Sequence, residues 1–363
     1  MKPQPFHNRR PETASTVLRI HLAALLLCAS AAYADPRMTA HFIDVGQADA
    51  TLLEFPCGAV LLDAGAQDDE HVATLTNYLK AFFARRGDLH NTLESVIITH
   101  NHLDHTRSLR AVVENFTVKR YLDHGMLDGA GTAHPKWVRQ QAAARGIAVR
   151  EISDEQIPTT GDRQGLTDAQ IDPLSCAECD PQIAILAARR LEKGAWSEED
   201  FENKNNESLV VRVAFGSTVF LFTGDAEEPE LEVLTERYRD TSTLDADVYH
   251  AGHHGSANAT TAPLLALVSP MIAVISVGQW NYGKGTLDRF TTWYYGHPRA
   301  QAVKLLANSI PYARARYTKE KLADKPMLFR NVQIRKAIYA TAWDGHVRIT
   351  ATEASKFIIE PEK

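Results

Sequence analysis

The sequence contains little cysteine, no long apolar run and no excess of positive charge. Only 4 of its 363 residues are cysteine, and only Cys176 and Cys179 stand at Cys-x-x-Cys spacing. Because a zinc site built from four sulfurs needs a second such pair, that class of site is excluded. With 44% hydrophobic and 23% charged residues, the chain is otherwise typical of a globular protein that can bury a substantial core.

The apolar run near the N-terminus is too short to span a bilayer. It covers residues 22–34, follows four basic residues and ends in Ala32-Tyr33-Ala34, a small-x-small pattern. We predict a secretory signal peptide over residues 1–34, cleaved before Asp35, with an uncleaved N-terminal anchor as the alternative. The mature chain, 35–363, is then expected to be periplasmic or secreted, without a transmembrane anchor.

Positive charge is scarce in the mature chain. Residues 1–34 hold four of the 39 basic and one of the 45 acidic residues, which leaves 35 against 44 and a net charge of −9. The bulk charge therefore gives no support for sequence-independent binding of DNA. Basic clusters remain at Lys136–Arg150 and Arg314–Lys325, and each is more typical of a solvated helix face than of a nucleic-acid patch.

Three cysteines remain after cleavage, namely Cys57, Cys176 and Cys179. In an oxidising compartment the closely spaced pair Cys176 and Cys179 is expected to form a disulfide. Cys57 is then left over, and we expect it to be buried.

Short strands that alternate with amphipathic helices predict an α/β fold in a single domain. Strands are predicted over 39–45, 50–55, 59–62, 95–99, 183–186, 208–215, 218–223, 246–249 and 271–277. Apolar residues at helical spacing predict helices over about 72–86 and around Leu109. Residues 151–205 are expected to form a polar, loop-rich insertion, and residues 337–350 a closing hairpin.

Three of the predicted strands end in metal-ligand residues. The stretch Thr99–His105 reads THNHLDH, Asp225 follows the strand over 218–223, and the pair His253–His254 follows the strand over 246–249. An accidental His-x-His-x-Asp-His has a chance on the order of one in a thousand over such a chain. Because ligands collect at the carboxyl ends of strands in α/β folds, we predict a metal site instead of a polar loop.

The residue types predict a catalytic site for one or two metal ions. Alternation along the loop lets His100 and His102 face one ion while Asp104 and His105 face a second, with Asp225 as a bridge. Imidazole and carboxylate together suit Zn²⁺, with Mn²⁺ as the alternative. Two ions about 3.5–4 Å apart would lower the pKa of a bridging water. Hydrolysis by a metal-bound hydroxide is therefore the expected reaction.

The order of the motifs resembles that of the metallo-β-lactamase superfamily. The motifs are Asp44-Val-Gly-Gln47, His100-x-His102-x-Asp104-His105, Thr223-Gly-Asp225 and His253-His-Gly-Ser256. Further stretches, Asn205–Val210, Val274–Gly278 and Tyr295–Pro298, are similar to the hydrolase domain of ComEC-type competence (DNA-uptake) proteins and their stand-alone exported relatives. The resemblance implies an αββα sandwich, two mixed sheets flanked by helices, with metals at the sheet edges.

The resemblance also implies a role for each motif residue. It makes His100 and His102 ligands of one metal, Asp104, His105 and His253 ligands of the other, and Asp225 the bridge, with Asp104 and Asp225 as the catalytic residues. The superfamily's third histidine for the first metal is missing, because that region holds Asn205 and Asn206. The first site is therefore expected to be the weaker one.

Other polar residues are candidates for the missing ligand or for a substrate contact, each with a structural role as the alternative. They are His124, Asn206, His250, His254, Ser256 and His297. Asp44 is expected to brace the histidine loop from behind the ligands, as metal-bound imidazoles usually require.

Three functions fit these residues. The favoured one is an exported metal-dependent hydrolase of phosphodiesters, small-molecule or nucleic-acid, with DNA included and no stable protein partner. The second keeps the site but acts on a lactone, thioester or β-lactam. The third is a non-catalytic module that binds a metal or DNA.

Overall fold

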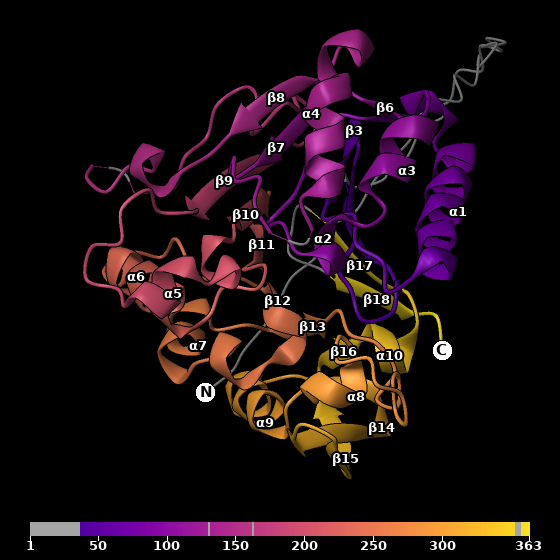
Figure 1. Cartoon of the computed structure of the whole chain (residues 1–363), viewed down its shortest axis with the longest axis vertical. Coiled ribbons are helices and arrows are strands. Elements are labelled where there is room, and N and C mark those ends of the chain that lie inside the picture. Colours follow the sequence, from indigo (N-terminus) through magenta and orange to yellow (C-terminus); the bar gives the residue numbers. More distant parts are fainter. Residues whose placement is uncertain (1–36, 130, 162, 353–356) are drawn as a thin grey trace, which may run out of the picture. The chain divides into compact units, whose positions relative to one another are not determined.

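Two β-sheets face each other across the main hydrophobic core, and helices cover their outer faces (Figure 1). The computed structural model describes residues 37–363 except 130, 162 and 353–356, and the predicted signal peptide lies outside the described residues. Residues Asp35–Lys363 form one compact unit. The predicted α/β sandwich of two mixed sheets is confirmed.

The first sheet has eight strands and is antiparallel on one side and parallel on the other. From edge to edge the strands are β18 (Phe357–Pro361), β17 (Val347–Thr352), β1 (Arg37–Phe42), β2 (Thr51–Phe55), β3 (Gly58–Leu62), β5 (Ser95–Ile97), β7 (Arg120–Asp123) and β8 (Ala148–Glu151). Pairing is antiparallel from β18 to β3 and parallel from β3 to β8.

The second sheet has six strands. In order they are β16 (Ile338–Ala340), β13 (Ile272–Ile275), β12 (Val248–His250), β11 (Thr218–Phe222), β10 (Val210–Phe215) and β9 (Gln182–Ala187). The four strands from β16 to β11 are parallel, and β10 forms the predicted hairpin with β11. Two small two-stranded sheets complete the fold, β4 (Thr92–Leu93) with β6 (Thr117–Val118) and β14 (Ala313–Lys325) with β15 (Leu328–Lys336).

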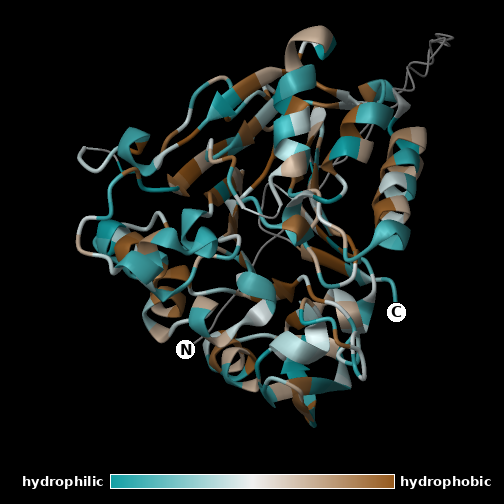
Figure 2. Ribbon diagram, in the orientation of Figure 1, coloured by the Kyte–Doolittle hydropathy of each residue, from teal (hydrophilic) through white to brown (hydrophobic). Residues whose placement is uncertain are grey.

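Alternation of side chains along the strands separates two cores. In β2, Leu53 points into the space between the sheets, whereas its neighbour Leu52 points outward into a second cluster. Aromatic rings join the two sheets, since Phe42 of β1 stacks on Phe222 of β11 with ring centroids 6.2 Å apart. The apolar strands are visible as brown arrows in Figure 2.

Helices cover both outer faces. The first sheet is covered by α1 (Asp69–Arg85), α3 (Leu109–Asn115) and α4 (Ala133–Arg145), and the second by α6 (Glu228–Tyr238), α7 (Ala262–Val268) and α9 (Ala300–Ser309). Shorter helices are α2 (Leu103–Thr106), α5 (Glu198–Glu202), α8 (Thr292–Tyr295) and α10 (Thr341–Asp344). Asp68 caps α1 by accepting a hydrogen bond from the backbone N–H of His71. No helix among the described residues is both long and apolar enough to cross a membrane.

The predicted cysteine pairing is wrong. Cys176 is bonded to Cys57, 119 residues earlier, and not to its close neighbour Cys179. The expected burial of Cys57 is also wrong, because Cys57 is exposed at the turn between β2 and β3. Leu174, two residues before Cys176, lies directly against Gly58 beside Cys57. Packing of the segment around Leu174, and not closeness in sequence, therefore selects the partner.

Two further expectations about the C-terminal part are corrected. Residues 337–350 do not form a hairpin, because β16 joins the second sheet, α10 follows, and β17 joins the first sheet. The basic cluster Arg314–Lys325 is not a helix face but strand β14, whereas Lys136–Arg145 does lie on helix α4. The short strand predicted near 183–186 is confirmed as β9, the edge of the second sheet.

Candidate metal centre

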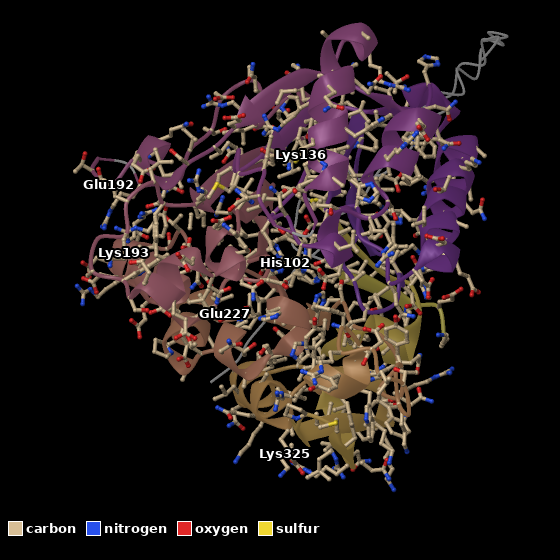
Figure 3. The ribbon with its side chains drawn as sticks, in the orientation of Figure 1. His102, Lys136, Glu192, Lys193, Glu227 and Lys325 are labelled. Atoms are coloured by element: carbon tan, nitrogen blue, oxygen red, sulfur yellow. A yellow bond between two sulfur atoms is a disulfide. The ribbon has the colours of Figure 1, made fainter. Side chains whose placement is uncertain are left out.

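The candidate ligands meet where parallel strands from both sheets end. Strands β3 and β5 of the first sheet lead into Asp63 and the histidine loop, and strands β11 and β12 of the second lead into Asp225 and the His253–His254 turn. The carboxyl ends of parallel strands share one edge of a sheet, so residues distant in sequence come together there. Figure 3 labels His102 and Glu227 near the middle of the molecule, where these loops meet.

Four histidines surround the carboxylate of Asp225. Its Oδ1 lies 3.3 Å from His105 Nε2, and its Oδ2 lies 3.7 Å from His254 Nε2. His100 Nε2 and His253 Nε2 both lie 3.8 Å from Oδ2. The aspartate is buried, with only 3% of its surface exposed. Asp225 therefore lies at the centre of the imidazole cluster.

Asp63 fixes the orientation of His105. Its Oδ2 accepts hydrogen bonds from His105 Nδ1 at 2.7 Å and from the Thr99 hydroxyl at 2.7 Å, and its Oδ1 accepts one from the Thr99 N–H at 2.8 Å. Because Nδ1 carries the donated proton, Nε2 is the nitrogen that faces Asp225, and it offers its lone pair when the ring is neutral. This arrangement is the support that metal-bound histidines usually receive from a neighbouring carboxylate.

His254, and not His253, lies with Asp104 and His105. His254 Nδ1 donates to the carbonyl of Ser276 at 2.8 Å, and its Nε2 lies 3.3 Å from Asp104 Oδ2. His253 is the more exposed of the two, and its Nδ1 lies 3.2 Å from Glu227 Oε1. Both histidines have left-handed backbone conformations, with φ near 50°, which turns their adjacent side chains toward different neighbours.

Opposite charges outweigh burial in setting the ionisation of this cluster. Burial alone would lower the pKa of His254, but Asp225 and Asp104 raise it to about 9. In the same way, Asp225 and Asp63 raise the pKa of His105 well above its usual value despite burial. Burial would raise the pKa of Asp225, but the surrounding histidines hold it well below its usual range. Without a cation, the cluster can only balance its carboxylates by holding protons on the imidazoles.

The chemistry of the donor set fits a divalent metal. His105 Nε2 is buried and makes no hydrogen bond within the described residues, although Asp225 Oδ1 is 3.3 Å away. When Nδ1 donates its proton to Asp63 and the His105 ring is neutral, the Nε2 lone pair faces the Asp225 carboxylate. Two acceptors then face each other, and only a cation between them can bind both. Among the described residues, three groups of three ligand atoms are compact enough to hold an ion: His100 with His105 and Asp225, Asp104 with His105 and His254, and His105 with Asp49 and Asp63.

A glycine allows the Asp104 loop to approach the first sheet. A Cβ atom on Gly65 would lie 1.6 Å from the carbonyl oxygen of Asp104 and 2.6 Å from that of Asp49. The N–H of Asp49 donates to the same Asp104 carbonyl at 3.0 Å. Only glycine fits at this contact. The close contact fixes the position of Asp104 relative to the ends of the strands.

The histidines of the proposed first site lie on the same side of the cluster. His100 is fully buried and its Nε2 lies 3.1 Å from His102 Nδ1. Burial, reinforced by His105, lowers the pKa of His100 well below its usual value. His102 lies at the rim and is partly exposed. His100 therefore has the shorter approach to Asp225.

Most of the further candidates are engaged in other contacts. His124 is buried and lies 3.7 Å from Glu207, and burial lowers its pKa to about 3. The Asn206 amide donates to the Asp200 carbonyl and accepts from the Glu227 N–H, so it shapes its own loop. The Ser256 hydroxyl donates to Asn258 within its turn.

His250 and His297 lie closer to the cluster. His250 Nε2 is 2.9 Å from the Ser276 hydroxyl, and its Nδ1 is 3.4 Å from Asp49 Oδ2. The His297 ring centroid is 5.4 Å from that of His253 and 6.2 Å from that of His254. His297 therefore lines one side of the candidate metal centre, and His250 lies beside Asp49.

Asp44 does not brace the histidine loop. Its carboxylate accepts from the Gly46 N–H at 3.4 Å and lies 3.6 Å from Lys363 Nζ, on the C-terminal side of the fold. Asp63 holds the expected position instead. The signal for it was the stretch Leu62-Asp-Ala-Gly65 at the end of a predicted strand, where a polar residue follows a buried run. Glu227, beside His253 and held by Asn205 at 2.7 Å, also has no motif of its own.

The sequence is similar to that of one known family. The family model described as the metallo-beta-lactamase superfamily matches residues 43–279. ComE operon protein 3 of Bacillus subtilis is 27% identical over 279 residues, which cover 73% of this chain and 30% of that protein. Competence protein ComA of Neisseria gonorrhoeae is 31% identical over 125 residues, 32% of this chain and 17% of that protein. The chain thus spans less than a third of the length of these relatives.

Among solved structures, the metallo-beta-lactamase fold protein YhfI of Bacillus subtilis is similar to this chain. The match has 13% identity and a TM-score of 0.38, and it covers 66% of this chain and 85% of YhfI.

Proposed function

Because the chain belongs to the metallo-β-lactamase superfamily, we propose that it is a metal-dependent hydrolase whose favoured substrates are phosphodiesters. The observation that carries this proposal is the buried carboxylate of Asp225 within 3.8 Å of four imidazole nitrogens. Such mixed histidine and carboxylate sets with a partly open side are typical of catalytic metal sites.

The residues that would hold the metal are His105, His254, Asp104 and Asp225, with His100 and His102 on the weaker side. One or two ions, Zn²⁺ or Mn²⁺, would supply Lewis-acid activation of water and of the scissile group. Asp63 and the Ser276 carbonyl hold His105 and His254 by their Nδ1 atoms, so both Nε2 atoms stay directed at the carboxylates.

Asp104 is the carboxylate best placed to orient an attacking water. About 30% of its side chain is exposed, whereas Asp225 is 4% exposed. Burial would raise the pKa of Asp104, but His254 and His105 hold it well below its usual value, so the carboxylate is ionised at neutral pH. An ionised, accessible carboxylate can accept a hydrogen bond from the attacking water, whereas its low pKa makes it a weak base.

The phosphodiester class is favoured by the relatives. Competence protein ComA of Neisseria gonorrhoeae is named for competence. Recombination protein 2 of Haemophilus influenzae is 40% identical over 78 residues, 21% of this chain and 9% of that protein. These names concern DNA, and they support a phosphodiester over a lactone, thioester or β-lactam. This chain matches only a part of each of these relatives.

We further propose that the chain is exported. The Cys57–Cys176 bond is of a kind that persists in oxidising compartments. N-terminal sequencing of protein from cells is expected to find Asp35 first, and an intact Met1 on the soluble protein would contradict export by cleavage.

The test of the hydrolase proposal begins with metal analysis of the purified mature protein. Turnover of bis-p-nitrophenyl phosphate, single-stranded DNA and nitrocefin is then measured with added zinc or manganese. Asp225→Asn keeps the side-chain volume but removes the central charge, so phosphodiester turnover should fall by at least a hundredfold. Asp240→Asn, in an exposed turn, is the matched control and should keep wild-type turnover.

The outcomes separate the alternatives. Metal-free protein without turnover would contradict the hydrolase proposal. Turnover of nitrocefin but not of bis-p-nitrophenyl phosphate would keep the metal site and overturn the substrate class.

A further inference from the structure

The β14–β15 hairpin concentrates positive charge in a chain that is acidic overall. Residues 313–336 contain eight Lys or Arg and two Asp or Glu, a net of +6, whereas the whole chain carries −6. The hairpin lies at the lower end of the molecule in Figure 1, where Figure 3 labels Lys325. Within the described residues only Arg314 and Arg330 of the hairpin form ion pairs, with Asp344 and Asp324. Most of the positive charge is therefore not neutralised.

Exposed rings and apolar side chains are concentrated in the sequence on the hairpin and just before it. Of the eight large hydrophobic side chains that are exposed among the described residues, six lie between positions 287 and 328: Leu287, Phe290, Tyr312, Tyr317, Met327 and Leu328. Phe290 is 79% exposed and Tyr317 is 60% exposed. Rings of this kind, interspersed with basic side chains, are what single-stranded nucleic acids stack upon.

A cavity of about 270 Å³ lies between the hairpin and α9. It is lined by apolar side chains such as Leu322 and Ile334 and by the basic side chains of Lys304, Arg330 and Arg335. An apolar space bordered by positive charge can take a flat ring whose attached phosphates remain at the rim.

The hairpin is bonded to the segment that carries His297, beside the metal centre. The Ala323 N–H donates to the Pro298 carbonyl at 3.0 Å, and Pro298 follows His297, which contacts His253 and His254. At the turn, Pro326 packs so closely on Gly296 that a Cβ there would lie 2.9 Å from its Cα. A strand that followed the hairpin would therefore arrive at the side of the centre that His297 lines.

Aromatic packing keeps the hairpin in this position. Phe329 of β15 stacks on Trp293 of α8 with centroids 5.5 Å apart, and Trp280 lies 5.7 Å from Phe329. Lys321 Nζ lies 5.2 Å from the Trp280 ring and Lys284 Nζ 5.0 Å from the Trp293 ring. These contacts make the hairpin a fixed element and not a loose arm.

We propose that the β14–β15 hairpin and Phe290 form a binding surface for single-stranded nucleic acid that leads a strand to the metal centre. Cleavage at the end of that path rests on the proposed hydrolase function, but binding to the hairpin does not. A strand of 13 residues is about 40 Å long, enough to contact several nucleotides. We assign a single strand as the occupant, because the exposed rings can stack only on unpaired bases. A membrane surface is a poorer fit, because the basic side chains are spread along the whole hairpin and not gathered at its turn.

The test measures binding apart from chemistry. Fluorescence anisotropy of a labelled 20-residue oligothymidylate is recorded with the full mature protein in EDTA, so no hydrolysis occurs. The hairpin variant carries Arg316→Glu, Lys319→Glu and Lys325→Glu, three exposed positions without an acidic partner among the described residues. The control variant carries Lys80→Glu, Lys136→Glu and Arg239→Glu, which change the net charge by the same amount elsewhere.

The hairpin variant is expected to bind at least tenfold more weakly, and the control variant less than twofold more weakly. The slope of log affinity against log salt should fall by about 2 in the hairpin variant, because three phosphate contacts are lost. Tyr317→Ala, which keeps the charge, should weaken binding about fivefold through lost stacking. Equal losses in the two charge variants, or no binding by the wild type at 50 mM salt, would overturn the proposal.

Further measurements separate the binding proposal from the hydrolase proposal and from other kinds of ligand. Bis-p-nitrophenyl phosphate turnover should be unchanged in the hairpin variant, since that small substrate does not reach the hairpin. Oligonucleotide binding without turnover of either substrate would overturn the hydrolase proposal alone. Tighter binding to a 20-base-pair duplex, or hairpin-dependent sedimentation with phosphatidylglycerol vesicles in the absence of oligonucleotide binding, would overturn the single-strand assignment.

Discussion

Replacing Asp63 by asparagine tests how the metal centre is oriented. The carboxylate accepts three short hydrogen bonds, two from Thr99 and one from His105 Nδ1, and is 2% exposed. An asparagine has one acceptor where two are needed, so its amide group must face either the Thr99 N–H or His105 Nδ1. In the second orientation His105 becomes protonated on Nε2 and loses the lone pair that faces Asp225.

The expected magnitude follows from these contacts. Loss of a carboxylate that orients a metal-bound histidine typically weakens metal affinity ten- to a hundredfold, or about 1.4–2.7 kcal/mol. In the first orientation two buried donors face each other instead, which lowers the free energy of unfolding by about 1–3 kcal/mol. Either orientation of the asparagine is detectable. An amide group that faces the Thr99 N–H lowers the free energy of unfolding, and one that faces His105 Nδ1 lowers the affinity for zinc.

The assay is zinc titration against a colorimetric chelator, with urea unfolding of the metal-free protein alongside. Asp44→Asn is the matched control, because Asp44 has the motif position that the sequence favours, but its carboxylate contacts Gly46 and Lys363 and not the histidine loop. It should change zinc affinity less than threefold. If Asp44→Asn weakens zinc binding as much as Asp63→Asn, or if Asp63→Asn changes neither property, the reasoning is refuted.

Three other perturbations have defined outcomes. Gly65→Ala should lower the free energy of unfolding by about 3 kcal/mol and reduce bound zinc, because the new Cβ would overlap the Asp104 carbonyl; urea unfolding and metal analysis measure both. Since the pKa of His254 is raised to about 9, zinc binding at pH 7.5 should release at least one proton, and zinc affinity should rise with pH up to about 9; calorimetry in two buffers of different ionisation enthalpy counts the protons. Cys176→Ser should lower the free energy of unfolding by about 4 kcal/mol, because the lost bond closes a loop of 119 residues; urea unfolding with and without reductant measures it.

Each of these has a result that would contradict it. Wild-type zinc content in Gly65→Ala would show that the loop does not depend on that close contact. Zinc binding without proton release at pH 7.5 would mean that the imidazoles are already neutral. Cys179→Ser is the control for the disulfide, and an equal loss in that variant would assign the effect to packing.

The sequence predicts the parts of this site that depend on local pattern. Buried strands followed by polar residues locate the histidine loop and Asp225, and the order of strands in an α/β fold brings them to one edge. The closeness of His105 and Asp225, whose nearest side-chain atoms lie 3.3 Å apart, is therefore expected from these local patterns.

Other parts depend on conformation or on packing between distant segments. His253 and His254 are equivalent in sequence, and only the left-handed backbone at both residues turns His254 toward Asp104. Asp63 has no motif beyond a strand end, so its bond to His105, 42 residues later, needed the fold. In the same way, β14 has the composition of a solvated helix, and its pairing with β15 is what makes it a strand.

Anomalous diffraction at the zinc edge, from crystals of the zinc-loaded protein, locates bound metal directly. We expect a strong peak between Asp225 and the Nε2 atoms of His105 and His254, and a weaker one toward His100. Zinc bound elsewhere, with no peak beside Asp225, would contradict the proposed metal centre.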